Sequence, residues 1–248
     1  MTIDIIRLCE QRLVNVWPAV STMLMDGWVV RFAHGYSSRA NSASAIIPGA
    51  ELSEDLIAHI ERLYREAGQA SCVRVTPLAD ASVEPMLLAR GYHLKDRCLT
   101  MILPLDRFSP HDVDARVRLE AAPNRNWLDG VSARQVASKR SADHLLAIVG
   151  QLRVPASFAT LELDGKATAF AMAALDREWV EIGSVMVDAA YRGQGLGRAV
   201  VDALLVWATG LGAKHAFLQV DSANTAAVHL YRNRGFTDLY DYQTLVKA

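Results

Sequence analysis

Three glycines at alternate positions, Gly193, Gly195 and Gly197, follow an apolar strand-like segment and open an amphipathic helical pattern. Glycine permits positive φ and a close approach of the backbone, while the first turn of a helix leaves N–H groups unpaired and carries partial positive charge. We therefore predict that Arg192-Gly-Gln-Gly-Leu-Gly197 forms a cradle for an anion such as a pyrophosphate.

The spacing of this loop argues against two other phosphate-binding motifs. The glycines are two and two apart rather than G-x-G-x-x-G, and no acidic residue ends a second strand at the distance expected for a dinucleotide site. The loop also lacks the G-K-[ST] of a Walker loop. The loop therefore matches neither of these two phosphate-binding motifs.

The loop resembles the R/Q-x-x-G-x-G/A acetyl-CoA loop of the GCN5-related N-acetyltransferase (GNAT) superfamily. Its approach, Val187-Asp-Ala-Ala-Tyr-Arg192, is similar to V-x-P-x-Y-R, with alanine where proline is common. Further on, Asn224-Thr-Ala-Ala-Val-His-Leu-Tyr-Arg-Asn-Arg-Gly-Phe236 is similar to N-x-x-A-x-x-L-Y-x-x-x-G-F. The resemblance covers about residues 112–248. It implies an α/β fold with a mixed, mostly antiparallel central sheet flanked by helices, and acetyl-CoA as the acyl donor.

The resemblance also assigns groups that would hold acetyl-CoA. In such enzymes the strand before the loop splays from the strand after it, and the pantetheine arm pairs with the first of them like an added strand. The backbone expected to pair is that of Val185, Met186 and Val187. The amides expected to meet the pyrophosphate belong to Arg192, Gly193, Gln194, Gly195, Leu196, Gly197 and Arg198. Asn224 is expected to cap the next helix and, by resemblance, to contact the pantetheine region.

Acyl transfer to an amine needs an amine that has lost its proton, a polarised thioester carbonyl and a proton donor for the leaving thiolate. Glu181 matches the family's glutamate that takes the amine proton, and we favour it as the general base. A surface or salt-bridged glutamate is the alternative, with Glu178 and Ser184 as substitutes. Tyr231 matches the tyrosine that acts as general acid on the CoA sulfur, against a buried packing tyrosine.

Strand alternation predicts the orientation of this segment. Glu181, Gly183, Val185 and Val187 are expected on one face. Two arginines after the tyrosine, Arg232 and Arg234, could meet the CoA 3′-phosphate or face solvent.

Composition narrows the class of protein. The chain has 248 residues, 51% hydrophobic and 21% charged, with a formal net charge of −1, which is typical of a soluble globular protein. Nothing general favours nucleic acid or an anionic membrane as a partner. The seven histidines are far apart and the three cysteines form no C-x-x-C pair, so we expect no metal site and no disulfide framework. Without a secretory signal or a bilayer-length apolar run, a reducing cytoplasm is the expected location.

A connector rich in proline and acidic residues divides the chain near residue 110. We predict a degenerate GNAT-like N-terminal domain over 1–110 and a catalytic, acyl-CoA-binding GNAT domain over 111–248. Shifting the chain by 144 residues superposes the helix and strand patterns of the two halves, although few identities survive. The first half lacks the glycine loop and should not hold CoA. Two unrelated segments that share generic periodicity are the alternative.

Periodicity and turn residues predict the elements of each half. In the first half we expect a helix over 51–68, capped by Ser53, and a strand over 72–76. In the second half the predicted strands are 115–119, 156–163, 167–175, 179–187 and 216–220, followed by two short strands through Val246, with a hairpin turn at Asp164-Gly165. The predicted helices are 125–137, 142–153, 193–211 and 225–234.

Polar residues also interrupt an apolar β-like region of the first half. Arg31, Arg39 and Asn41 indicate either a satisfied structural network or a wall that faces substrate, and we favour the structural network.

These observations favour an N-acetyltransferase that transfers an acetyl group from acetyl-CoA to a primary amine by direct attack, as a monomer or homodimer. The acceptor is a small molecule or a peptide or protein amine. The alternative is a non-catalytic acyl-CoA-binding sensor or regulatory module.

Overall fold

Apolar residues at helical and strand spacing build the first half of the chain. We describe residues 3–108, 113–133 and 141–248 of a computed structural model. The predicted helix over 51–68 is present but shorter, because Ser53 caps its first turn by accepting the Leu56 N–H. The elements of the first half are α1 (Ile3–Val16), β1 (Ser21–Met25), β2 (Trp28–Phe32), β3 (Ala43–Ala45), α2 (Glu54–Glu66), β4 (Ser71–Val75), α3 (Val83–Ala89), β5 (His93–Pro104) and a 3₁₀ turn (Leu105–Arg107).

The second half follows the sequence pattern closely. Its elements are β6 (Val117–Glu120), α4 (Arg125–Ala133), α5 (Ala142–Val149), β7 (Ala156–Leu163), β8 (Lys166–Asp176), β9 (Trp179–Val187), a 3₁₀ turn (Ala189–Tyr191), α6 (Leu196–Gly210), β10 (His215–Asp221), α7 (Thr225–Asn233) and β11 (Thr237–Lys247). The hairpin turn between β7 and β8 has positive φ at Asp164 and Gly165, as its sequence predicts.

The prediction of two short final strands is wrong, because residues 237–247 form one long strand whose register shifts replace a break. The domain boundary predicted near residue 110, and the end of the helix predicted over 125–137, lie outside the described residues.

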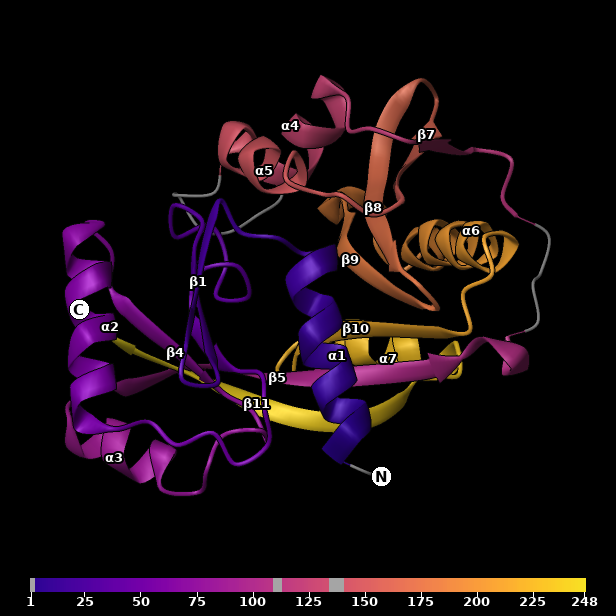
Figure 1. Cartoon of the computed structure of the whole chain (residues 1–248). Coiled ribbons are helices and arrows are strands. Elements are labelled where there is room, and N and C mark those ends of the chain that lie inside the picture. Colours follow the sequence, from indigo (N-terminus) through magenta and orange to yellow (C-terminus); the bar gives the residue numbers. More distant parts are fainter. Residues whose placement is uncertain (1–2, 109–112, 134–140) are drawn as a thin grey trace.

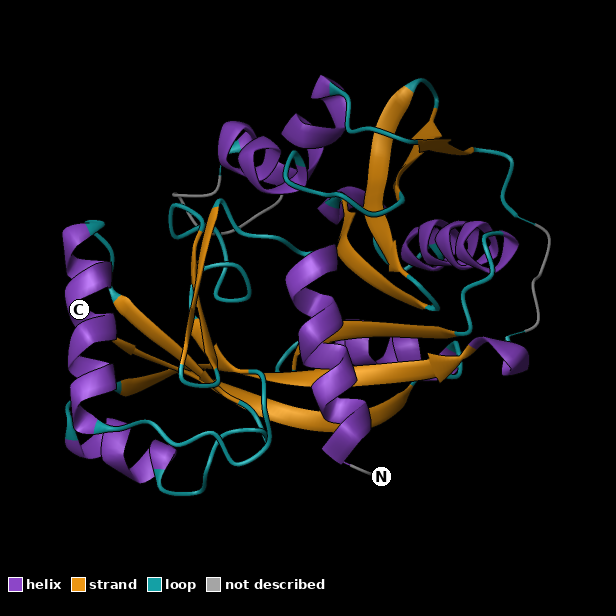
Figure 2. Cartoon of the chain, in the orientation of Figure 1, coloured by secondary structure: helices purple, strands orange, loops and turns teal. Residues whose placement is uncertain are grey.

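The strands of the described ranges form one sheet, in the order β1-β2-β3-β4-β11-β5-β10-β9-β8-β7-β6. Only β3 with β4 and β9 with β10 pair in parallel; the other neighbours are antiparallel. In Figure 1, α1 crosses in front of the central strands and α7 lies behind them, and Figure 2 shows helices flanking the sheet. The predicted fold class, a mixed and mostly antiparallel sheet flanked by helices, is confirmed.

The final strands of the two halves are exchanged. At the offset of 144 residues α2, β4, α3 and β5 fall on α6, β10, α7 and β11. Yet β5 pairs with β10 of the second half, and β11 pairs with β4 of the first. Strands β5 and β11 also pair with each other at the centre of the sheet. The two halves therefore share one sheet, and neither half completes its strand order alone.

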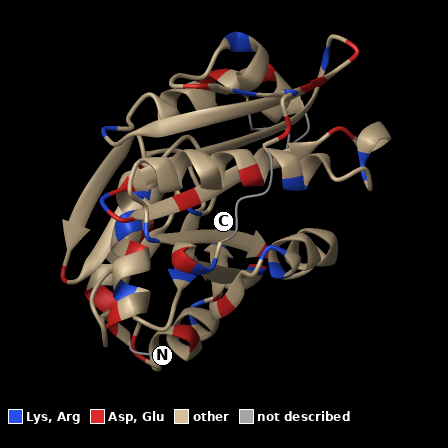
Figure 3. Cartoon of the chain, turned by 90° about the vertical axis from the view of Figure 1, so that its right-hand side faces the viewer, with Lys and Arg blue, Asp and Glu red and all other residues tan. Residues whose placement is uncertain are grey.

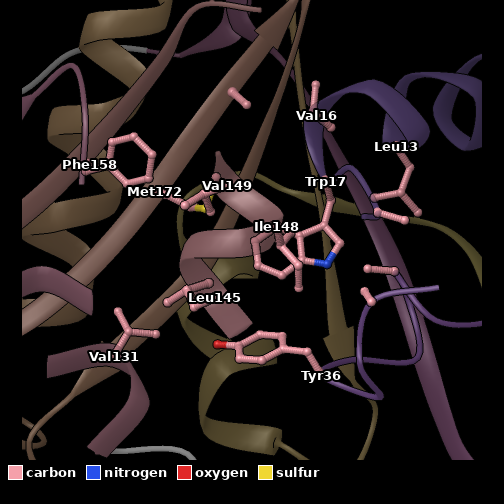
Figure 4. Packing of buried hydrophobic residues seen from close by; sticks show 14 of the residues in the cluster. Leu13, Val16, Trp17, Tyr36, Val131, Leu145, Ile148, Val149, Phe158 and Met172 are labelled. Atoms are coloured by element: carbon pink, nitrogen blue, oxygen red, sulfur yellow. The ribbon is translucent and has the colours of Figure 1, made fainter. Parts of the chain in front are cut away.

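Three apolar clusters fill the space between the sheet and its helices. The first joins α1 and the 33–40 loop to α4, α5 and one face of β8. Figure 4 shows Trp17 and Tyr36 of the first half beside Leu145 and Ile148 of α5. The second cluster lies under α6 and α7, and the third under α2 and α3. The first cluster is thus an interface between the halves.

A buried ion pair joins α1 to the sheet. Both Arg74 Nη atoms donate to the Glu10 carboxylate, at 2.9 and 3.0 Å, and both side chains are at most 2% exposed. The Tyr240 hydroxyl donates to the same carboxylate, and Ser44 Oγ accepts from Arg74 at 3.3 Å. Desolvation of two charges is expensive, so such a pair is stable only when hydrogen bonds satisfy both partners.

We expect Arg74→Met to destabilise the protein by about 3–5 kcal/mol, because it leaves the Glu10 charge buried and unpaired. The double variant Arg74→Met/Glu10→Leu should lose less than the sum of the single variants. Urea unfolding monitored by circular dichroism measures both. Arg232→Met, which breaks an exposed pair with Asp238, is the control and should cost less than about 1 kcal/mol. Equal losses for the buried and exposed pairs would contradict this account.

Candidate active site

Strand β9 separates from β10 after the first third of its length. The parallel pairing of the two strands ends at Phe217 opposite Glu181. On its other edge β9 stays paired with β8, but Ser184 and Val185 together oppose the single residue Ala171, and Ser184 has a φ of 52°. This is a β-bulge, which bends a strand and increases its twist. The divergence that the resemblance implies is therefore present, and the β10-facing edge of β9 is open beyond Glu181.

The bulge overturns the predicted alternation. Val185 and Val187 pack with the cluster under α6 that contains Ile182, whereas Met186 packs with the opposite cluster. Glu181 and Gly183 lie opposite Ala174 and Met172, residues of that opposite cluster. The prediction that Glu181, Gly183, Val185 and Val187 share a face is wrong, because the extra residue in the bulge shifts the alternation by one.

The glycine loop has the backbone that its sequence predicts. Gly193 and Gly195 have φ values of 77° and 78° and are exposed. Gly195 is the N-cap of α6 and no side chain caps this helix; its first backbone bond runs from Ala199 N to Gly195 O, at 3.0 Å. An added Cβ at Gly193 or Gly195 would meet nothing within 4 Å. The start of α6 is thus uncapped, and the space beside Gly193 and Gly195 is open, as an anion site requires.

The next two residues of the motif contribute only backbone to such a site. The Leu196 side chain is buried in the cluster under α6. Gly197 is a packing position, because a Cβ there would lie 3.1 Å from Leu230 and 3.4 Å from Val187. Gln194 and Arg192 are exposed.

The corresponding helix of the first half offers no such site. Ser53 Oγ accepts the Leu56 N–H of α2 at 3.2 Å, and Glu54 and Asp55 occupy the first turn. Negative side chains complement the positive end of the helix dipole and repel an anion. An anion cradle is therefore a feature of α6 and not of α2.

The arginines near the motifs bind carboxylates. Arg234 donates to Asp202 at 2.6 Å with 9% of its side chain exposed, and Arg198 donates to the same carboxylate at 3.3 Å. Arg232 pairs with Asp238 at 2.6 Å on the surface. The sequence left the roles of Arg232 and Arg234 open. The largely buried pairing of Arg234 with Asp202 is that of a structural contact.

Glu181 is completely buried and ion-paired. Its Oε1 accepts a hydrogen bond from Arg39 Nη1 at 2.7 Å, whereas its buried Oε2 has no partner among the described residues. A Cβ at Gly183 would lie 3.0 Å from that Oε2, so glycine leaves room beside the carboxylate. Burial raises the pKa of Glu181, and the nearby Arg39 charge and hydrogen bond oppose the rise.

The two alternatives to Glu181 lie in different surroundings. Glu178 is exposed and forms a salt bridge with Lys214 at the opposite end of β9 from the loop. Ser184 occupies the bulge itself.

Tyr231 projects from α7 into the cluster under α6. It is 7% exposed and packs edge-on against Phe236, with ring centroids 5.9 Å apart. Burial raises the pKa of Tyr231 well above its usual value, and the negative charge of nearby Glu181 adds to the rise. The phenol therefore keeps its proton throughout the neutral range.

Asn224 begins α7, where its side chain accepts the Ala227 N–H at 3.2 Å. The predicted cap is confirmed. The contact with the pantetheine region stays a prediction.

One residue of the site comes from the other half of the chain. The favoured structural role is confirmed for Arg31, which donates to the Arg39 carbonyl at 2.7 Å, and for Asn41, which accepts the Ala33 and Gly35 N–H groups. Arg39 instead reaches Glu181 across 142 positions of sequence. No local pattern marks this contact, because polar residues in a loop have the same sequence signature whether or not they face a site.

Neither the distribution of charged residues nor a cluster of metal-ligating side chains indicates a second site in the described ranges. In Figure 3, basic and acidic positions are mixed along the elements, in keeping with a net charge of −1. Within the described ranges no three His, Cys, Asp or Glu side chains lie close enough to hold a metal ion. None of the helices in those ranges is long and apolar enough to cross a bilayer.

Comparisons with known proteins identify the family. The family model described as "Probable histone acetyltransferase Rv0428c C-terminal" matches residues 3–245. The chain is 25% identical to the uncharacterized N-acetyltransferase YobR of Bacillus subtilis, over 98% of this chain and 99% of that protein. It is 26% identical to the probable histone acetyltransferase Rv0428c of Mycobacterium tuberculosis, over 90% of this chain and 68% of that protein.

A solved structure agrees with this assignment at the level of fold. The GCN5-related N-acetyltransferase from Kribbella flavida superposes with a TM-score of 0.71 at 16% identity, covering 98% of this chain and 94% of that one. With the open edge of β9 and the uncapped glycine loop, these matches show that the chain belongs to the Rv0428c C-terminal family of acetyltransferases within the GNAT superfamily.

Proposed function

We propose that this protein transfers an acetyl group from acetyl-CoA directly to a primary amine of a small molecule or a protein. The observation that carries the proposal is the continuity of three features. The open edge of β9 begins beside Glu181, runs through residues 185–187 and ends at the uncapped first turn of α6. An extended amide-bearing arm and a pyrophosphate need this combination of unpaired strand edge and helix N-terminus.

The residues at the start of this edge suit the proton transfers of the reaction. The amine nitrogen forms a bond to the thioester carbonyl carbon, the C–S bond breaks, and CoA leaves as a thiolate. Glu181, with its raised pKa, accepts the proton released by the amine, directly or through water. Tyr231, which stays protonated at neutral pH, donates a proton to the thiolate and is reprotonated from solvent. No covalent enzyme intermediate is needed: Cys9 and Cys72 are buried, and burial also raises the pKa of the Cys98 thiol.

A panel of amines tests the function. We expect release of free thiol from acetyl-CoA in the presence of some members of a panel of amino acids, polyamines and peptides with free N-termini or lysines. Glu181→Gln should lose most of that release at neutral pH and recover part of it at higher pH, where more amine is already neutral. Its acetyl-CoA Kd, measured by calorimetry, should stay within a few-fold. Binding of acetyl-CoA without thiol release from any amine would favour a binding module instead.

The glycine loop is tested by a matched pair of variants. Gly195→Val should lose most of the acetyl-CoA affinity, because the Cβ would occupy the space in front of the first-turn amides and valine resists a φ of 78°. Gly212→Val is the control, since Gly212 also has a positive φ of 87° and no atom within 4 Å of an added Cβ, but lies after the other end of α6. Calorimetric titration measures both and should give one site per chain for the wild type. Equal losses of affinity would show that backbone strain, rather than the cradle, is responsible.

Tyr231 is tested by removing only its hydroxyl. Tyr231→Phe should lower kcat by roughly 10²–10⁴-fold, the usual contribution of a positioned acid, while the ring still packs and the acetyl-CoA Kd changes little. Tyr92→Phe removes another buried hydroxyl, bonded to Ser71 at 2.6 Å in the cluster of the first half, and should leave kcat unchanged. Steady-state kinetics on the accepted amine provide the measurement. A near-normal kcat for Tyr231→Phe would mean that the thiolate leaves without an acid.

A further inference from the structure

We propose that Arg39, from the N-terminal half, is a positioning residue for the C-terminal site: it holds Glu181 ionised and engages its Oε1, so that Oε2 is the oxygen left to accept a proton. Arg39 Nη1 lies 2.7 Å from Oε1, the Glu181 side chain is 0% exposed and Oε2 has no partner in the described ranges. An isolated buried carboxylate would protonate, so the adjacent Arg39 cation is what keeps Glu181 charged.

The loop that carries Arg39 is rigidly held. The Arg39 backbone carbonyl accepts a hydrogen bond from the buried Arg31 at 2.7 Å. The Arg39 guanidinium lies over the Trp17 ring, 5.0 Å from the ring centroid. Trp17 Nε1 donates to Ser37 Oγ at 3.0 Å, and Ala40 N donates to the Ser37 carbonyl at 3.1 Å. These contacts fix the guanidinium before any substrate arrives, as a positioning role requires.

Packing between the halves places this loop against the site. Ala33, Tyr36 and Ala40 belong to the apolar cluster that also contains Leu145 and Ile148 of α5 (Figure 4). The Arg39 side chain retains 20% exposure, so the pair lies at the edge of the buried interior rather than deep within it.

The Glu10–Arg74 pair shows by contrast that Glu181 is unusual. In that pair both carboxylate oxygens accept from Arg74, and a tyrosine hydroxyl donates as well. Both oxygens of the Glu10 carboxylate are thus satisfied, whereas Glu181 keeps one oxygen without a partner among the described residues. A buried acceptor without a partner costs free energy, which is expected where a substrate or water supplies the missing donor.

Few other charged groups act on the pair. Arg39 is the charged group that acts on Glu181, and Tyr231 of α7 is the other titratable group coupled to both. On the sheet, Arg31 of β2, Tyr242 of β11 and Cys98 of β5 are coupled to Arg39. Two imidazole contacts lie on neighbouring elements: His34 stacks on His144 of α5, and His215 stacks on Trp179 of β9. The tests below include a Glu181→Gln background, in which any contribution of these histidines remains.

The first test needs no catalysis. The folded-state pKa of Glu181 is raised, so the stability contributed by the neutral form is present below the unfolded pKa and lost as pH rises through the folded pKa. Arg39→Met raises that pKa further. Its unfolding equilibrium constant, from urea titrations between pH 5 and 8, should therefore rise with pH more than that of the wild type, by about tenfold per added pKa unit. The extra rise should vanish in Arg39→Met/Glu181→Gln. If it persists there, or never occurs, the proposal is overturned.

The second test rests on the proposed function and uses an amine that the panel identifies. Arg39→Met should move the acidic limb of the kcat/KM profile to higher pH, because Glu181 must be ionised to accept a proton, and Arg39→Lys should restore most of the wild-type profile. In the Glu181→Gln background Arg39→Met should have no further effect. Arg12→Met is the control, since Arg12 forms another buried pair between the halves, with Asp176 at 3.3 Å, and should leave the profile unchanged.

The two tests distinguish a failure of the role inferred for Arg39 from a failure of the proposed function. Turnover with an unshifted profile in Arg39→Met would reduce Arg39 to a structural contact and overturn the inference, with the proposed function intact. Absence of turnover with every amine, together with the expected stability coupling, would overturn the proposed function while Arg39 still controls the charge of Glu181.

Discussion

The position of β5 between β10 and β11 is the constraint on which the rest of the molecule depends. Backbone N–H and C=O groups in a sheet must be paired, and β5 satisfies an edge of each neighbour along nearly its full length. Because β5 belongs to the first half and both neighbours to the second, the two halves fold as one sheet. The same exchange brings α1 and the 33–42 loop onto the face of β8 and β9 that carries Glu181.

Within that continuous sheet, β9 and β10 separate before either strand has ended. The bulge at Ser184 diverts β9, and a non-glycine residue with positive φ carries a conformational cost that only the surrounding packing sustains. Strain of this kind is concentrated at functional sites. Here it leaves an open strand edge in line with the uncapped start of α6, so that strand and helix present unpaired donors along a common path.

Two arginine–glutamate pairs with a buried carboxylate differ in how many of their carboxylate oxygens accept hydrogen bonds. Arg74 donates to both oxygens of the Glu10 carboxylate and ties α1 to the sheet, and such hydrogen bonds make a buried pair tolerable. Glu181 and Arg39 share a single hydrogen bond, and the second carboxylate oxygen lies 3.0 Å from where a Cβ at residue 183 would stand, so glycine there makes room for the carboxylate. The difference lies in the number of satisfied acceptors. It distinguishes a pair that stabilises the fold from one that is prepared to exchange a proton.

The sequence by itself determined the features that depend on a few neighbouring residues. Apolar periodicity predicted β7 and β9 to the residue, and glycine at 193 and 195 predicted the left-handed backbone of the loop, because φ preferences and amphipathic spacing are local. The motif resemblance added the family. The exchange of β5 and β11, the bulge at Ser184 and the reach of Arg39 to Glu181 were decided only in the tertiary structure. An apolar strand pattern is equally compatible with several partners, so long-range packing and the pairing of backbone groups select among them.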